Sequence, residues 1–198
     1  MSNQYPNFEY EKNLGGKIVG IDEVGRGCLA GPVVAAGIIL SDEIDVSEIN
    51  DSKKISEKKR IKLHKYLTAN CTYSIGISSV EEIEDINILQ ASLLAMRRVI
   101  NQLSCHNVHI IVDGNVSPDT SLANITNIVS GDQKSLTIAA ASIIAKVTRD
   151  NIMKDLDLIF PQYYWKKNKG YGTIQHREAI KLYGTTKHHR DSFLSKII

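Results

Sequence analysis

The residues best suited to chemistry are four acids, each following an apolar segment with the composition of a buried strand: Asp22, Glu23, Asp113 and Asp132. Mixed sheets place their sites at strand ends, so we expect several of these carboxylates to converge. Clustered carboxylates repel one another, and this repulsion raises the pKa of some of them. A divalent cation that prefers oxygen ligands removes the repulsion.

Mg²⁺ and Mn²⁺ suit such a set, because both bind a few carboxylates together with waters and the oxygens of a substrate phosphate. With two ions bound, one activates the attacking water and the other stabilises the leaving oxygen. The pattern therefore predicts metal-dependent hydrolysis of a phosphodiester bond.

Two of the four acids have an ordinary structural interpretation when each is taken alone. Asp113 opens an Asp-Gly-Asn sequence typical of a turn, and Asp132 stands where an acid often caps a helix. Asp22 and Glu23 differ, because two adjacent acids at the end of an apolar strand have no role in packing. Neighbouring strand residues point to opposite faces. Both acids therefore serve one site only if the strand breaks there, or if Glu23 reaches over or contributes its carbonyl.

Strands and helices must position these acids, and the hydrophobic pattern predicts both. Apolar or alternating segments predict strands over 17–21, 32–40, 71–78, 108–112 and 125–129. Helical spacing predicts helices over 56–69, 80–103, 134–158 and 174–183. We expect an α/β fold in which helices flank a mixed five-stranded sheet, with a helical C-terminal segment.

The bulk composition is that of one globular domain, with 198 residues of which 42% are hydrophobic and 23% charged. We expect an N-terminal tail over 1–16 and a single domain over 17–198. Apolar runs are too short for a membrane span, and the first residues lack the layout of a secretion signal. Cys28, Cys71 and Cys105 have unrelated spacings and predict free thiols. We therefore expect a cytoplasmic protein, and a monomer.

Basic residues concentrate toward the C-terminus. The segment 160–198 holds eight basic and two acidic residues, whereas the rest of the chain holds 16 basic and 20 acidic residues. A basic segment on an acidic body suits a partner that carries phosphates, although a solvated basic helix gives the same count.

A series of short motifs runs along the chain after about residue 17. They are GIDEVGRG (20–27), LAGPV (29–33), NDSKK (50–54), INIL (86–89), DGN (113–115), GD (131–132), AAASIIAKVTRD (139–150), KGYGT (169–173), HHR (188–190) and SF (192–193). Together they resemble ribonuclease HII, the type 2 ribonuclease H family. One such motif would be weak evidence, whereas this many in order is specific.

The resemblance implies a ribonuclease H-like fold and a metal set formed by the four acids, with two Mn²⁺ or Mg²⁺ ions when substrate is bound. Asp22 would bridge both ions, Glu23 and Asp132 would complete one site, and Asp113 the other. The implied substrates are RNA–DNA hybrids and duplex DNA containing ribonucleotides. The cut would fall 5′ of the ribonucleotide and leave 3′-hydroxyl and 5′-phosphate ends. Roles in ribonucleotide excision repair and DNA replication would follow.

The resemblance also implies substrate contacts. The segment Gly25, Arg26 and Gly27 would sense the 2′-hydroxyl through backbone groups, which glycines allow to approach closely. Tyr171 matches a tyrosine that stacks on the sugar beyond the ribonucleotide. Expected phosphate contacts are Lys53, Lys54, Lys146, Arg149, His188, His189 and Arg190. By helical spacing, Lys146 and Arg149 could instead orient the carboxylates.

Other functions compete with this interpretation. Ribonuclease HIII carries an added N-terminal domain and lacks the central arginine that Arg26 supplies. A nuclease of the same fold that acts on DNA junctions would leave the segment 25–27 and Tyr171 without a role. A non-catalytic binding module would be expected to have lost a carboxylate, and none is missing. A glycosidase with a carboxylate pair does not account for the basic segment.

Overall fold

The centre of the molecule is a five-stranded mixed sheet in the order β3-β2-β1-β4-β5. The computed structural model describes residues 5–40, 43–103, 108–119 and 124–195, so Cys105 lies outside the described residues. The strands are β1 (Ile18–Val24), β2 (Val33–Ile39), β3 (Thr72–Ser78), β4 (His109–Asp113) and β5 (Asn124–Ile128). The β1–β2 and β2–β3 pairs are antiparallel, whereas β1–β4 and β4–β5 are parallel. The expected α/β fold is confirmed.

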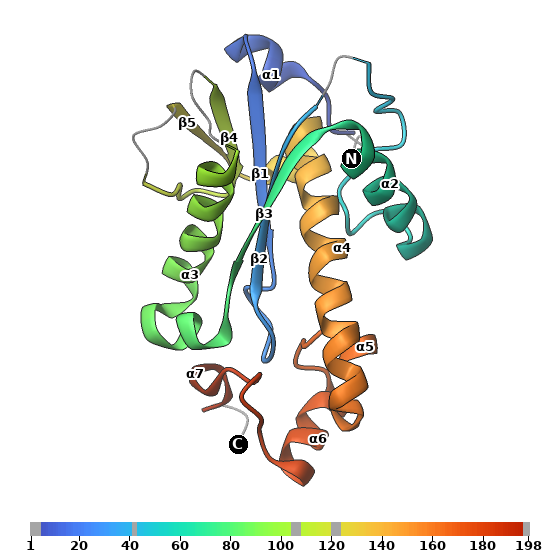
Figure 1. Ribbon diagram of the computed structural model, residues 1–198, viewed down its shortest axis with the longest axis vertical. Coiled ribbons are helices and arrows are strands. Elements are labelled where there is room, and N and C mark those ends of the chain that lie inside the picture. Colours follow the sequence, from blue (N-terminus) through green and yellow to red (C-terminus); the bar gives the residue numbers. More distant parts are fainter. Residues whose placement is uncertain (1–4, 41–42, 104–107, 120–123, 196–198) are drawn as a thin grey trace.

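Helices cover both faces of the sheet, with α3 on one side and α2 and α4 on the other (Figure 1). The helices are α1 (Glu9–Leu14), α2 (Glu57–Asn70), α3 (Val80–Gln102), α4 (Leu136–Ile159), α5 (Trp165–Asn168), α6 (Ile174–Tyr183) and α7 (Asp191–Leu194). Short 3₁₀ turns are η1 (Gly131–Gln133) and η2 (Pro161–Tyr163). The four helices expected from the sequence form close to their predicted bounds.

β1 is buried on both faces, and alternation assigns its side chains to different helices. Val19 and Ile21 belong to the core against α3, whereas Ile18 packs with Ile138 of α4. Gly20 faces α4 so closely that a Cβ there would lie 2.5 Å from the carbonyl carbon of Thr137. The absence of a side chain at this position therefore lets the start of α4 rest directly on the strand that carries the acids.

α3 contains a break that the apolar spacing alone does not reveal. Asn87 has a φ of 66° within the helix, and its side-chain oxygen accepts hydrogen bonds from the N–H groups of Leu89 and Gln90. Asn87 therefore ends one helical segment and caps the next. Ser79 and Glu82 form a reciprocal capping box at the beginning of α3.

Part of the segment expected as a tail, 1–16, forms the short helix α1. Tyr10 and Leu14 pack against an isoleucine cluster at the β1 and β4 side of α4. Glu11 accepts hydrogen bonds from the hydroxyl of Ser135 at 2.6 Å and from the N–H of Thr137 at 3.1 Å. α1 thus stabilises the beginning of α4, where a carboxylate interacts favourably with the helix dipole.

The C-terminal segment is helical, as expected, and lies beneath the sheet in Figure 1. Its core combines Leu29 and Ala30, which follow β1, with Met153 of α4 and Trp165 of α5. Among the helices of the described residues, none has the length and apolar character needed to cross a lipid bilayer.

We expect Gly20→Ala to lower the free energy of unfolding by about 1–3 kcal/mol, because the added methyl group would meet backbone atoms of α4. Denaturant unfolding measures this change. Gly27→Ala is the matched control, since a Cβ there meets open space, and its effect should stay within about 0.5 kcal/mol. Equal stability of Gly20→Ala and the wild type would contradict the close contact between β1 and α4.

Candidate active site

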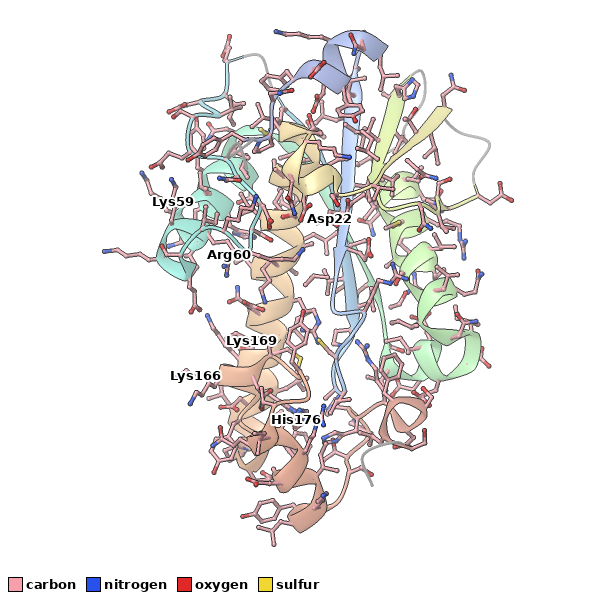
Figure 2. All side chains as sticks on the ribbon, turned by 180° about the vertical axis from the view of Figure 1, so that it is seen from behind. Asp22, Lys59, Arg60, Lys166, Lys169 and His176 are labelled. Atoms are coloured by element: carbon pink, nitrogen blue, oxygen red, sulfur yellow. The ribbon has the colours of Figure 1, made fainter. Side chains whose placement is uncertain are left out.

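Asp22 and Asp113 lie beside each other at the ends of two parallel strands. Ile21 pairs with Val112 in the β1–β4 register, so the next residue of each strand is one of the acids. Asp22 is only 6% exposed, where β1 passes α4 (Figure 2). Asp113 accepts a hydrogen bond from the N–H of Gly131 at 2.6 Å, which holds η1, and Asp132 within it, at the same edge.

Glu23 points to the opposite face of the sheet, because β1 continues through Val24 without a break at the two acids. The break comes one residue later, at Gly25, where φ is +102°. A hollow beside α3 is lined by both Glu23 and Asp113. One carboxylate oxygen of Glu23 lies 3.3 Å from the guanidinium of Arg26, and the other, Oε2, is buried without a hydrogen-bond partner.

The electrostatics show that the four carboxylates act on one another. Burial raises the pKa of Asp22 well above its usual value, and the charges of Glu23, Asp113 and Asp132 raise it further. Burial also raises the pKa of Glu23, against the opposing effect of Arg26. The pKa of Asp113 rises through burial and through Asp132, although the N–H of Gly131 opposes the shift. The structure thus brings the four predicted acids to one edge of the sheet.

Lys53 contacts this acidic edge from the segment before α2. Its Nζ lies 3.2 Å from a carboxylate oxygen of Asp132. Burial lowers the pKa of Lys53, but Asp132 and Asp22 outweigh that effect and raise the pKa above its usual value. The side chain of Lys54 turns to the neighbouring Gln133, at 3.5 Å.

The donor set suits a divalent cation in two respects. Asp22 is a buried carboxylate surrounded by three others, and Glu23 has a buried oxygen with no partner. A cation that binds oxygen would offset the repulsion among the carboxylates and would give the buried oxygen of Glu23 a partner. Within the described part of the chain, no three Asp, Glu, His or Cys side chains already stand as a group that could hold a metal ion.

The expectation of surface phosphate contacts is wrong for Arg149 and Arg190, since both are fully buried. Arg149 donates to the carbonyl oxygens of Pro32 at 2.9 Å, Ala30 at 3.0 Å and Lys169 at 2.8 Å. It therefore holds the loop 25–32, between β1 and β2, rather than a phosphate or the acids.

Arg190 performs the same task from the C-terminal segment. It donates to the carbonyl oxygen of Arg26 at 2.9 Å and, through two nitrogens, to that of Gly31 at 2.7 and 3.0 Å. Burial lowers the pKa of Arg190 to about 10, and the charge of Arg149 acts in the same direction. The two guanidinium groups join the loop 25–32 to the segment that contains Tyr171.

The expectation of a surface phosphate contact is also wrong for His189, which is only 2% exposed. Its Nδ1 accepts a hydrogen bond from the N–H of Thr186 at 3.0 Å, and its Nε2 lies 3.3 Å from that of His176. Half-buried His188 packs edge-on against the rings of Phe160 and Trp165.

The remaining predicted contacts are accessible or paired locally. Lys146 makes an ion pair with Asp150 at 2.7 Å, so its nearest acid lies outside the quartet. The side chain of Arg26 is 49% exposed, and Tyr171 is 40% exposed. Gly27 faces open space.

Sequence analysis missed a group of buried polar residues beneath Tyr171. Trp165 donates its indole N–H to Nε2 of His176 at 3.0 Å. Asn168 donates to the carbonyl of Tyr163 at 2.7 Å and accepts from the N–H of Gly170 at 2.8 Å. The only sequence signal is the concentration of aromatic residues and histidines between 160 and 190, which the count of basic residues had obscured.

Comparisons with known proteins agree with this architecture. The family model for ribonuclease HII matches residues 19–196. Ribonuclease HII of Wolbachia pipientis subsp. Culex pipiens is 50% identical over 191 residues, covering 96% of each chain. In the solved complex of PCNA with RNase HII from Archaeoglobus fulgidus, a chain 27% identical aligns with a TM-score of 0.76, covering 89% of this chain and 94% of that one.

A more distant structure shares the fold alone. Bst-RNase HIII, solved in complex with Mn²⁺, is 14% identical and aligns with a TM-score of 0.70, covering 89% of this chain and 66% of that one. The fold and the acidic edge thus define a ribonuclease H-like enzyme. The chain belongs to the ribonuclease HII family, whose metal-dependent members cleave the RNA strand of RNA–DNA hybrids.

We expect Asp22→Asn to stabilise the metal-free protein at pH 7. A carboxylate whose pKa is raised on folding contributes stability below its unfolded pKa and loses it as the pH rises toward the folded pKa. Asparagine does not titrate and so avoids that loss. Thermal unfolding with a chelator measures this, and each 1 kcal/mol gained should raise Tm by about 2–4 °C.

When Mg²⁺ or Mn²⁺ is added, the Tm of Asp22→Asn should rise less than that of the wild type. A bound ion stabilises the folded state that binds it, and the variant has lost one of the carboxylates expected to bind. Asp85→Asn, an exposed position on α3, is the matched control and should leave both measurements unchanged. A Tm below that of the wild type in chelator would contradict the destabilisation of Asp22 by burial and by the neighbouring carboxylates.

Acid is expected to weaken the fold in a window that His189 helps to set. Burial, with the charges of His176 and His188, lowers the pKa of His189 from 6.5 to about 4. The stability that neutral His189 contributes is therefore present above pH 6.5 and is lost as the pH falls toward 4. Urea unfolding across this range should show a smaller loss in His189→Asn, which keeps an acceptor for the N–H of Thr186. The same loss in both proteins would contradict this role.

Proposed function

We propose that this enzyme cuts duplex DNA on the 5′ side of embedded ribonucleotides, as well as the RNA strand of hybrids, and leaves 3′-hydroxyl and 5′-phosphate ends. The observation that carries the proposal is the position of buried Asp22, among three other carboxylates and three residues before Gly25. Asp22 and Glu23, at the end of β1, and the segment 25–27 thus lie on adjacent parts of one strand and loop.

In this proposal Asp22, Glu23, Asp113 and Asp132 would hold two Mg²⁺ or Mn²⁺ ions; Asp22 would serve both, Glu23 and Asp132 one, and Asp113 the other. The ions would supply an activated water and charge stabilisation at the leaving oxygen. The N–H of Gly131 and the ammonium of Lys53 fix the orientations of Asp113 and Asp132. Preorganised carboxylates need little rearrangement when the substrate phosphate arrives.

The segment 25–27 is suited to reading a 2′-hydroxyl through its backbone. The carbonyl of Arg26 is held by Arg190. Because the peptide unit is planar, this contact also fixes the direction of the Gly27 N–H. Open space around Gly27 leaves room for a sugar to approach, and the 2′-hydroxyl distinguishes RNA from DNA.

Tyr171 would stack on the sugar beyond the ribonucleotide, where its 40% exposure leaves the ring accessible. Lys53, Lys54, Lys146 and His188 remain the candidates for phosphate contacts. Phosphate contacts position a duplex without reading its sequence, which suits an enzyme that acts at any embedded ribonucleotide. We also propose that the enzyme is a cytoplasmic monomer that serves ribonucleotide excision repair and DNA replication.

The direct test compares cleavage of a DNA duplex carrying one ribonucleotide with cleavage of the all-DNA duplex, with Mg²⁺ or Mn²⁺. We expect cutting of the first duplex only, on the 5′ side of the ribonucleotide. End analysis should find a 3′-hydroxyl and a 5′-phosphate. Asp22→Asn and Asp113→Asn should each lower kcat by about 10²-fold or more, whereas Asp85→Asn should match the wild type. Equal cutting of both duplexes, or near wild-type rates in the first two variants, would overturn the proposal.

A further inference from the structure

His176 is fully buried in the C-terminal segment, well apart from Asp22 in Figure 2, yet both of its ring nitrogens are hydrogen-bonded. Nδ1 lies 2.9 Å from the carbonyl oxygen of Tyr171, which can only accept, so Nδ1 carries the proton. Nε2 accepts the indole N–H of Trp165 at 3.0 Å. These partners define one neutral tautomer of His176.

His189 completes the same network with the opposite tautomer. Its Nδ1 accepts from the N–H of Thr186, so the proton is on Nε2, which lies 3.3 Å from Nε2 of His176. The single lone pair of His176 Nε2 is therefore shared between the shorter bond from Trp165 and this longer one from His189. The ring of Tyr163 stacks on Trp165, with centroids 5.1 Å apart, and meets His189 edge-on at 4.7 Å. Every polar atom named here has a partner, which is the condition for burying such a network.

The network connects the two parts of the chain that would read the substrate. One end is the Tyr171 carbonyl, which also accepts from the N–H of Thr173 at 2.8 Å. At the other end, His189 directly precedes Arg190, whose guanidinium holds the carbonyl of Arg26. Backbone hydrogen bonds from Leu29 to Gly170 and from Gly31 to His188, each 2.8 Å, join the same two segments.

We propose that His176 is a positioning residue for substrate discrimination. Its Nδ1–H fixes the backbone of Tyr171, and its contact with His189 keeps Tyr171 in register with the segment 25–27. This inference rests on the proposed function, in which Tyr171 stacks on a sugar. Burying two imidazoles is costly unless their nitrogens are hydrogen-bonded, and here each ring nitrogen has a partner.

The test is a double-mutant cycle on the duplex with one ribonucleotide, using Tyr171→Ala, His176→Phe and the double variant. His176→Phe keeps a ring in the space and removes the hydrogen bonds of both ring nitrogens. We expect KM to rise by about 10-fold while kcat changes by less than about 2-fold, as for a contact made equally in the bound and transition states. The double variant should be no worse than Tyr171→Ala, because both changes remove the same contact.

His176→Asn places an amide N–H near the position of Nδ1 and should restore most of the wild-type KM. Trp165→Phe removes one of the two donors to Nε2 and should raise KM less than His176→Phe, which keeps the test valid should the latter fold poorly. His64→Asn, at a half-buried histidine of α2, is the matched control and should leave KM unchanged.

The outcomes separate the two proposals. Wild-type kinetics of Tyr171→Ala would overturn the sugar contact, and this inference with it. Independent, multiplying losses in the double variant would overturn the positioning role of His176 alone, as would a fall in kcat and Tm with no change in KM.

Discussion

The structure depends on two buried guanidinium groups that are bound by backbone carbonyls. Arg149 and Arg190 have no exposed surface, and their hydrogen bonds go to the carbonyl oxygens of residues 26, 30, 31, 32 and 169. Burying a positive charge is costly unless donors are satisfied, and here the satisfying atoms all belong to loops. These hydrogen bonds satisfy the buried guanidinium donors and the loop carbonyls together. They thereby fix the conformations of the loop 25–32 and of the segment before Tyr171.

The chain from Asp22 to Pro32 begins beside negative charges and ends beside positive ones. Asp22 lies at the acidic edge, where the carboxylates repel one another, and Pro32 ends the loop at the arginine pair. The acidic edge favours cations, whereas the arginine pair contributes a positive potential beneath the loop. A nucleic-acid backbone that brings phosphates, with metal ions as counterions, is complementary to both ends at once.

Much of this could be predicted from the sequence, because strand periodicity and acids at strand ends are local signals. The five strands, the long helices and the convergence of Asp22 with Asp113 followed from such signals. Arg149 and Arg190 could not be placed, since basic residues are usually exposed and most of their partners lie more than a hundred residues away. His189 could not be placed because its partners, Thr186 and His176, give no sequence signal of burial. α1 was missed because it has no fully buried residue and so no apolar periodicity.

The hydrogen bond from Arg190 to the carbonyl of Arg26 spans 164 residues of sequence. Contacts of such separation form late, because loop closure must be completed before they contribute to stability. On the ribosome, β1 and its acids emerge early, but the loop that follows them stays without its anchor until residue 190 has been synthesised. A nascent chain therefore carries Asp22 and Glu23 long before the loop 25–32 beside them is anchored by Arg190.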